Sequence, residues 1–265
     1  MAESADREGW QYRDFWARVG AKFPDLGGAA STRYYADNEE RLFREFLEPL
    51  TGRRVFKTDL WDEARNTRIL QWASERGARA FGLDLSPATT RMARAEFESI
   101  DQKLAAAVSD IRWVPFADQS FDAIYSMGTI EHFDETEQAI AEIFRVLKAG
   151  GRAVIGVPNR RDPFLRPLMV WVLYRLGLYG YGFEKSYSRA NLRRMLEGAG
   201  FDVIAESGIL FIPGWLRMLD LALHAWCRPL ARITGLAVKP FAWLYRKFPG
   251  VRRHGYLIAA VVIRP

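Results

Sequence analysis

Cysteine is almost absent from this 265-residue sequence, in which Cys227 is the only one. A single cysteine excludes an internal disulfide framework and a cysteine-rich metal site, so we expect no bound metal. No uncharged apolar run reaches the roughly 18 residues that a membrane-spanning helix needs. The first residues, MAESADREGW, have neither a basic segment nor an apolar core, so no secretory signal is visible. These absences favour a reducing compartment, and we expect a cytoplasmic location.

Acidic side chains are scarce in one part of the chain. The net charge is +6, but the segment 211–255 alone holds eight basic side chains and a single acid, Asp220. The rest of the chain is therefore close to neutral. An anionic partner is expected at this segment and not over the whole surface.

Strand patterns alternate with helix patterns through the middle of the chain. The sequence predicts helices that begin at Ser86-Pro87, that follow the spacing of Ile140, Ile143, Phe144 and Leu147, and that end at Gly200. The strands are predicted at 53–58, 79–85, 120–127, 151–158, 201–207 and 256–263. Strands separated by helices of 10 to 15 residues (about the length of a right-handed crossover) indicate an α/β fold with a doubly wound, mostly parallel sheet.

Two segments do not fit this alternation. We therefore divide the chain into an N-terminal helical cap (1–52), an α/β core (53–210) with an apolar cap segment (160–187), a basic amphipathic insert (211–255) and the last strand of the core (256–265). Within the insert, four polar residues share one helical stripe and tryptophans and leucines occupy the rest. The stripe contains Arg217, Asp220, His224 and Arg228.

Acidic residues follow three of the predicted strands. Ligands of doubly wound sheets bind at the carboxyl ends of the strands, so these residues are candidate ligand contacts. Asp84 could accept both hydroxyls of a ribose, Asp110 an exocyclic amine, and Asp59 a ligand ammonium group. The set suits a cationic nucleoside without phosphates, because a phosphate would be repelled.

Longer motifs surround these acids: GLDLSPATTRMARAEF (82–97), SDIRWVPFADQSFDAIYSMGTIEHF (109–133) and EIFRVLKAGGRAVIGVPN (142–159). With these motifs the sequence resembles the class I S-adenosylmethionine-dependent methyltransferases, in particular the branch that includes quinone-biosynthesis enzymes. The resemblance implies a Rossmann-like sheet of seven strands and S-adenosylmethionine as cofactor. It further implies a set of cofactor contacts: Asp84 with Leu85 at the ribose, Asp110 with Ile111 at the adenine, and Ser126, Met127 and Gly128 at the methionyl part.

The first turn departs from that family. Its pattern has three glycines after the first strand, whereas this chain reads KTDLWDEARNTRILQW, with no glycine between Gly52 and Gly77. Glycines in such a turn allow the backbone to approach a ligand closely. We align Asp59 with the family's acid; a gapless alignment instead places Trp61 there.

Glu131 and His132 follow the strand at 120–127, in the loop where the transferred methyl group would lie. The unperturbed pKa of histidine is near neutrality, so His132, with Glu131 beside it, is the candidate catalytic base. The predicted activity is methyl transfer to a hydrophobic or lipid-linked small molecule at an oxygen atom. The segments 163–183 and 211–255 are predicted to contact an anionic membrane, on its inner face, or to form a cap that encloses the substrate.

Two alternatives remain open at this stage. A non-catalytic, membrane-associated scaffold would account for the missing glycines. A nucleic-acid methyltransferase would account for the basic charge, but the Asn/Asp-Pro-Pro-Tyr/Phe segment typical of enzymes that act on base amino groups is replaced here by SMGTIEH. We therefore expect no nucleic-acid partner.

Overall fold

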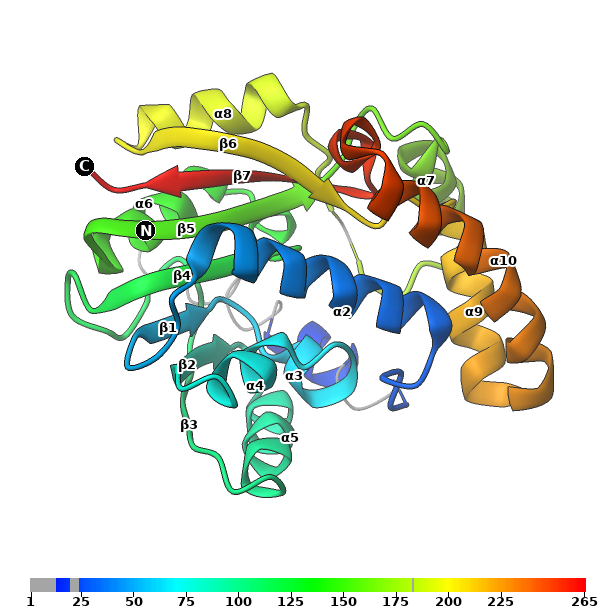
Figure 1. The fold of residues 1–265 in the computed structure, drawn as a ribbon, viewed down its shortest axis with the longest axis horizontal. Helices are drawn as coiled ribbons and strands as arrows, with labels where there is room; N and C mark the ends of the chain where they lie inside the picture. Colours follow the sequence, from blue (N-terminus) through cyan, green and yellow to red (C-terminus); the bar gives the residue numbers. More distant parts are fainter. Residues whose placement is uncertain (1–12, 20–23, 183) are drawn as a thin grey trace.

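The computed structural model describes residues 13–19, 24–182 and 184–265. Its centre is a seven-stranded sheet in the order β3-β2-β1-β4-β5-β7-β6 (Figure 1). All neighbouring strands are parallel except β7, which runs antiparallel to both β5 and β6. The strands are β1 (Arg54–Lys57), β2 (Arg79–Asp84), β3 (Leu104–Val108), β4 (Phe121–Met127), β5 (Leu147–Pro158), β6 (Asp202–Ile209) and β7 (Leu257–Ile263).

Helices cover both faces of this sheet. Residues 13–19 are helical, and the helices that follow are α2 (Ala30–Leu42), which continues as a π-helical turn (Phe43–Leu47), α3 (Trp61–Arg65), α4 (Ile69–Ser74), α5 (Pro87–Glu98), α6 (Thr136–Val146), α7 (Arg166–Arg175), α8 (Arg189–Gly198), α9 (Gly214–Trp226) and α10 (Arg228–Lys247). Two short 3-10 helices, Ile130–His132 and Pro249–His254, complete the set. None of the helices in the described ranges is long and apolar enough to cross a membrane.

The side chains of each buried strand alternate between two apolar layers. In β1, Val55 belongs to the layer that packs under α2, and its neighbour Phe56 belongs to the layer under α6 and α8. Tyr125 and Ile124 of β4 divide in the same way. This alternation follows from the two-residue period of a strand, and it makes the domain a three-layer α/β/α structure.

The predicted α/β fold, with its mostly parallel sheet, is confirmed. Ser86 caps α5 as expected, because its hydroxyl accepts a hydrogen bond from the Thr89 amide at 3.2 Å. One boundary was wrong: Leu147 was assigned to a helix, but its backbone is extended and it opens β5. Strand β3 was not predicted, since its sequence LAAAV is rich in alanine, which has little preference for strands.

Candidate active site

A cavity of about 760 Å³ lies at the carboxyl ends of β1, β2 and β4. Its size falls in the range of about 300–1,000 Å³ that is usual for small-molecule sites. One wall consists of residues that follow the strands, among them Asp59, Asp84 and Gly128. The opposite wall comes from α9, the segment 178–181 and part of the helical stretch 13–19. The cavity is therefore placed where a parallel sheet of this type binds its ligand.

Asp84, the last residue of β2, places a carboxylate in the wall of the cavity. Its carboxylate accepts hydrogen bonds from the backbone amides of Ser86 (2.7 Å) and Leu60 (3.1 Å). Each carboxylate oxygen keeps a lone pair for a further donor, and the side chain lines the cavity. Burial, together with the negative charge of Asp59, raises the pKa of Asp84 to about 7. Leu85 also lines the cavity.

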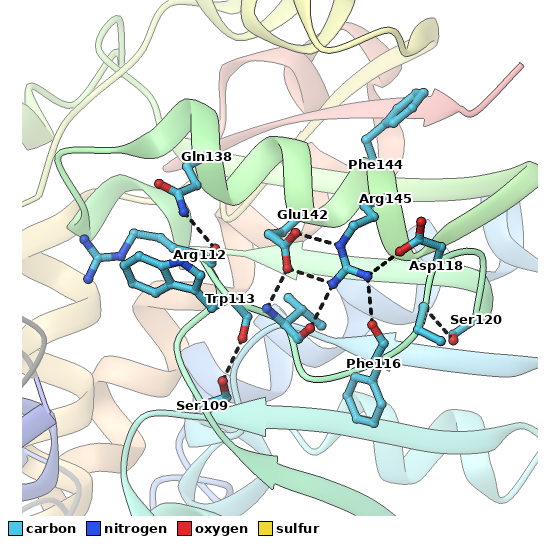
Figure 2. A network of polar contacts seen from close by, with 12 residues as sticks. Ser109, Arg112, Trp113, Phe116, Asp118, Ser120, Gln138, Glu142, Phe144 and Arg145 are labelled. Atoms are coloured by element: carbon cyan, nitrogen blue, oxygen red, sulfur yellow. Dashed lines mark hydrogen bonds and ion pairs between the residues drawn. The ribbon is translucent and has the colours of Figure 1, made fainter. Parts of the chain in front are cut away.

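The segment between β3 and β4 supplies the next part of this wall, through Ser109 and Ile111. It is tied to α6 by Arg145, whose guanidinium donates to the carbonyl oxygens of Val114 (2.8 Å) and Phe116 (2.9 Å) (Figure 2). Glu142 binds the same guanidinium at 2.7 Å and accepts the Val114 amide at 2.7 Å. These contacts fix the loop that carries the cavity residues.

The Asp110 carboxylate, in contrast, is bonded to another side chain of the same protein. Its carboxylate forms an ion pair with Arg112 at 2.8 Å, and Arg112, which is buried, also binds Glu135 at 2.6 Å. Asp110 does not belong to the described residues that line the cavity, although both of its neighbours do. Its contact with an adenine amine stays a prediction, and such a contact would compete with the ion pair to Arg112.

The turn after β1 contains a buried ionic cluster in place of glycines. Lys57 is fully buried, and its ammonium lies 3.0 Å from the Asp59 carboxylate and 3.7 Å from that of Asp62. Burial alone lowers the pKa of Lys57, but the surrounding carboxylates outweigh it and raise the pKa above its usual value. Asp59 also accepts a hydrogen bond from Thr129 (3.1 Å) and lines the cavity.

Helix α3 occupies the position of the expected flexible turn. Leu60 precedes it and packs so closely on β2 that a Cβ atom at Gly82 would lie 2.5 Å from its Cδ2. The glycine that allows a close contact is thus Gly82 on the neighbouring strand β2, and the turn after β1 needs none for this contact. Trp61 and Asp62 of α3 line the cavity, which remains open in their presence.

The end of β4 forms another part of the cavity wall. Met127 and Gly128 line the cavity, and Gly128 adopts a positive φ of 75°. Ser126 is buried behind them, where its hydroxyl accepts a hydrogen bond from Thr58 at 2.8 Å. Of the three residues predicted near the methionyl part, two therefore reach the cavity and one supports the strand end.

Glu131 and His132 both line the cavity. Glu131 is buried, and its Oε2 makes no hydrogen bond with any described residue. Burial, with the nearby charge of Glu184, raises the pKa of Glu131 well above its ordinary value. The His132 Nε2 lies 3.9 Å from Glu131 Oε1, and the imidazole packs edge-on against Trp16. The predicted catalytic pair thus lies side by side in the cavity wall.

The sequence did not reveal a buried group on the cap side of the cavity. Arg166 binds Glu184 through two contacts of 2.5 Å and 3.0 Å, and the Tyr179 hydroxyl donates to the same carboxylate at 2.7 Å. All three side chains line the cavity. The available signal was the isolated charge of Arg166 in an apolar stretch, since a charge in such a place needs a buried partner.

Comparison with known proteins agrees with this geometry. The profile of the "Methyltransferase domain" family matches residues 63–155, a range that begins inside α3 and so leaves out the β1 turn. A relative from Mycolicibacterium smegmatis named "Probable S-adenosylmethionine-dependent methyltransferase" is 26% identical over 190 residues, which is 69% of this chain and 65% of that protein. A demethylmenaquinone methyltransferase of Chlorobaculum parvum is 36% identical over 93 residues, which is 35% of this chain and 37% of that protein.

Solved structures share the fold. The geranyl diphosphate C-methyltransferase of Streptomyces coelicolor, solved with S-adenosyl-L-homocysteine, has a TM-score of 0.59 and 14% identity, and the alignment covers 88% of this chain and 80% of that one. The chain spans less than two thirds of the length of the curated relatives named above.

Residues 63–155 match the methyltransferase domain family, and the fold is the one that solved methyltransferase structures have. In sequence the chain is similar to S-adenosylmethionine-dependent methyltransferases, whose cofactor is S-adenosylmethionine. The residues present fit S-adenosylmethionine, because the cavity has a volume of about 760 Å³ and the Asp59 and Asp84 carboxylates line it as acceptors.

Proposed function

We propose that this protein transfers a methyl group from S-adenosylmethionine to an oxygen atom of a hydrophobic or lipid-linked small molecule. The observation that carries this proposal is a cavity with two chemically different walls. The strand ends present Asp59 and Asp84, whereas α9 presents mainly apolar side chains, Met218 and Leu221 among them, together with Arg217. A polar cofactor and an apolar acceptor would each find a matching surface.

Relatives support the class of acceptor. Their names include a tocopherol O-methyltransferase, a ubiquinone biosynthesis O-methyltransferase and the demethylmenaquinone methyltransferase already described. Tocopherol and the two quinones are lipid-soluble rings that carry apolar tails. A ring of this kind suits the cavity, where its oxygen would reach Glu131 while its tail would extend along α9.

Bound S-adenosylmethionine supplies an electrophilic methyl group on a sulfonium centre. Asp84 would accept the ribose hydroxyls, and Asp59, held in place by Lys57 and Thr129, would accept the ammonium group. Glu131 in its ionised form, beside His132, would take the proton of the acceptor hydroxyl on its unpartnered Oε2 and become neutral. The acceptor oxygen would bond to the methyl group as the bond from that group to the sulfur breaks, which leaves a neutral thioether. The closed, apolar surroundings would keep water away from the reacting oxygen.

Substitution of Glu131 tests the chemical step. With a lipid-soluble phenol or quinol as acceptor, Glu131→Gln is expected to lower kcat by about 10²–10⁴-fold, the usual contribution of a general base, and to leave the KM for S-adenosylmethionine unchanged. The matched control is Glu137→Gln, because Glu137 is exposed in the first turn of α6. Equal activity of both variants would remove Glu131 from the mechanism.

A second candidate function is a non-catalytic scaffold, which the glycine-free turn favours. This candidate predicts that the folded protein neither binds S-adenosylmethionine nor releases S-adenosyl-L-homocysteine with any acceptor. The location that we propose for either function is the inner face of a membrane, where lipid-linked acceptors reside.

A further inference from the structure

Two helices at one end of the molecule, α7 and α9, have charged residues inside and large apolar residues outside. In α9, Asp220 and Arg217 are buried, while Trp215 is 60% and Trp226 is 90% exposed. In α7, Arg166 is buried and Trp171 is 55% exposed. A helix of a water-soluble protein normally has the opposite arrangement.

The inward polar stripe of α9 is firmly bonded. The Asp220 carboxylate accepts the Ser31 amide at 2.8 Å and the Thr234 hydroxyl at 2.7 Å, which ties α9 to both α2 and α10. The Arg217 guanidinium lies over the Tyr35 ring. The polar stripe of this helix is thus partly internal, and this orientation leaves Trp215, Leu219 and Trp226 exposed.

The exposed apolar side chains are concentrated on this end. Figure 1 shows α7, α9 and α10 gathered on one side of the molecule. Of the nineteen large apolar side chains that are exposed among the described residues, fifteen lie in 165–178 and 215–248. They are Leu165, Leu168, Trp171, Val172, Tyr174, Leu176, Leu178, Trp215, Leu219, Trp226, Leu230, Ile233, Leu236, Trp243 and Phe248. An apolar surface of this kind marks a binding site.

The charge of these helices identifies the occupant. Among α7, α9 and α10 the only acid is Asp220, which is buried, so none of the three presents a negative charge to solvent. Their exposed charged side chains are all basic: Arg175, Arg228, Arg232, Lys239, Arg246 and Lys247. Tryptophan and leucine among arginine and lysine match the boundary of an anionic bilayer, where each basic residue contributes about 1 kcal/mol.

The cavity opens toward the same end. Trp226 and Leu178 are both exposed and both line the cavity, so they mark its mouth. Met218, Leu221 and Ala225 continue the wall inward from Trp226 along α9. The apolar surface and the cavity wall are therefore two sides of one helix.

We propose that α7, α9 and α10 dock onto an anionic lipid bilayer, so that the mouth at Trp226 and Leu178 faces the lipid. The docking itself depends only on the surface. The entry of an acceptor from the bilayer rests on the proposed function. A lipid-linked molecule would then pass into the cavity without crossing water.

Vesicle co-sedimentation of the full chain, without cofactor, tests the docking. Vesicles of phosphatidylcholine with about one third phosphatidylglycerol are expected to bind the protein at least about tenfold more tightly than pure phosphatidylcholine. Ile233→Glu, on the outer side of α10, is expected to weaken binding by about tenfold or more, because a charge replaces an inserted side chain. The matched control is Ile204→Glu on β6, which is similarly exposed but lies outside the surface and should bind as the wild type.

A charge reversal separates lipid binding from other occupants. Arg232→Glu with Lys239→Glu is expected to abolish the preference for anionic vesicles. Failure of the wild type to bind either kind of vesicle would overturn the proposal. In that case, a dimer in sedimentation velocity that Ile233→Glu dissociates would assign the surface to a second copy of the chain.

Fluorescence quenching tests the position of the mouth. Brominated anionic vesicles are expected to quench the wild type more than Trp226→Phe, because a tryptophan at the mouth would lie among the lipid tails. Equal quenching would place the mouth away from the bilayer. These measurements need no methyl transfer, so a protein that binds vesicles but not S-adenosylmethionine would refute the proposed function alone.

Discussion

The two walls of the cavity differ in how they are built. The strand-end wall is built on the sheet: Asp84 accepts the amides of Ser86 and Leu60, and the loop before β4 is pinned to α6. The cap wall is built from helices and loops outside the sheet, which are held by contacts such as Arg166 with Glu184 and Asp220 with Ser31. The two walls are thus built separately, one on the strand ends of the sheet and the other on the segments that cover them.

Within the strand-end wall, the β1 turn is the exception. Where the family uses glycines, this chain uses the ionic cluster of Lys57, Asp59 and Asp62 followed by α3. The cluster gives rigidity where glycines would give close approach. The Lys57 ammonium therefore fixes the Asp59 carboxylate in place without a ligand, as a pre-organised hydrogen-bond acceptor requires.

The largest expected effect is on stability. Lys57→Met would leave Asp59 and Asp62 without their buried counter-charge, so the free energy of unfolding is expected to fall by about 3–5 kcal/mol. Urea denaturation measures this change. Lys148→Met is the control, since the Lys148 ion pair with Asp122 is partly exposed and should contribute less than about 1 kcal/mol. Similar losses in both variants would show that the cluster is not a structural centre of the turn.

The next largest effect distinguishes two roles of Asp110, as the ion-pair partner of Arg112 or as a contact of the adenine amine. Asp110→Asn is expected to lower the free energy of unfolding by about 1–3 kcal/mol, because Arg112 loses a buried charged partner. The affinity for S-adenosylmethionine is expected to change by less than about threefold, a difference under 1 kcal/mol. Thermal unfolding and calorimetric titration of the same variant give both values. A large loss of affinity in a stable protein would instead support the adenine contact that the sequence predicts.

The smallest effect is a dependence on pH. The pKa of Asp84 is about 7, raised mainly by burial. Because the ionised carboxylate is the form that accepts two hydroxyls, the affinity for S-adenosylmethionine is expected to fall by up to about tenfold per pH unit below 7. Ionisation is disfavoured in the fold, so the contribution of Asp84 to stability decreases as the pH rises from about 4 to 7. Affinity that does not change between pH 6 and 8 would contradict this assignment.

The sequence predicts the strand-end wall well and the cap wall poorly. Asp84 could be found because an acid at the end of a buried parallel strand must lie at the carboxyl edge of the sheet, where ligands bind. The stripe of Arg217 and Asp220 could also be found by its spacing. The helical period, however, does not determine whether the polar or the apolar side of the helix faces the core. That direction was set by Ser31 and Thr234, which come from other helices. Hydrogen bonds between side chains of different helices, such as those of Asp220, produce no periodic pattern in the sequence from which they could be predicted.

Calorimetric titration of the full, folded chain with S-adenosylmethionine tests the central claim most directly. We predict saturable binding at one site, weakened by about 10–100-fold in Asp84→Asn, in which charge-assisted hydrogen bonds to the ribose are lost. Absence of any heat of binding across pH 6 to 8, with no competition by S-adenosyl-L-homocysteine, would contradict the claim that this glycine-free site holds the cofactor.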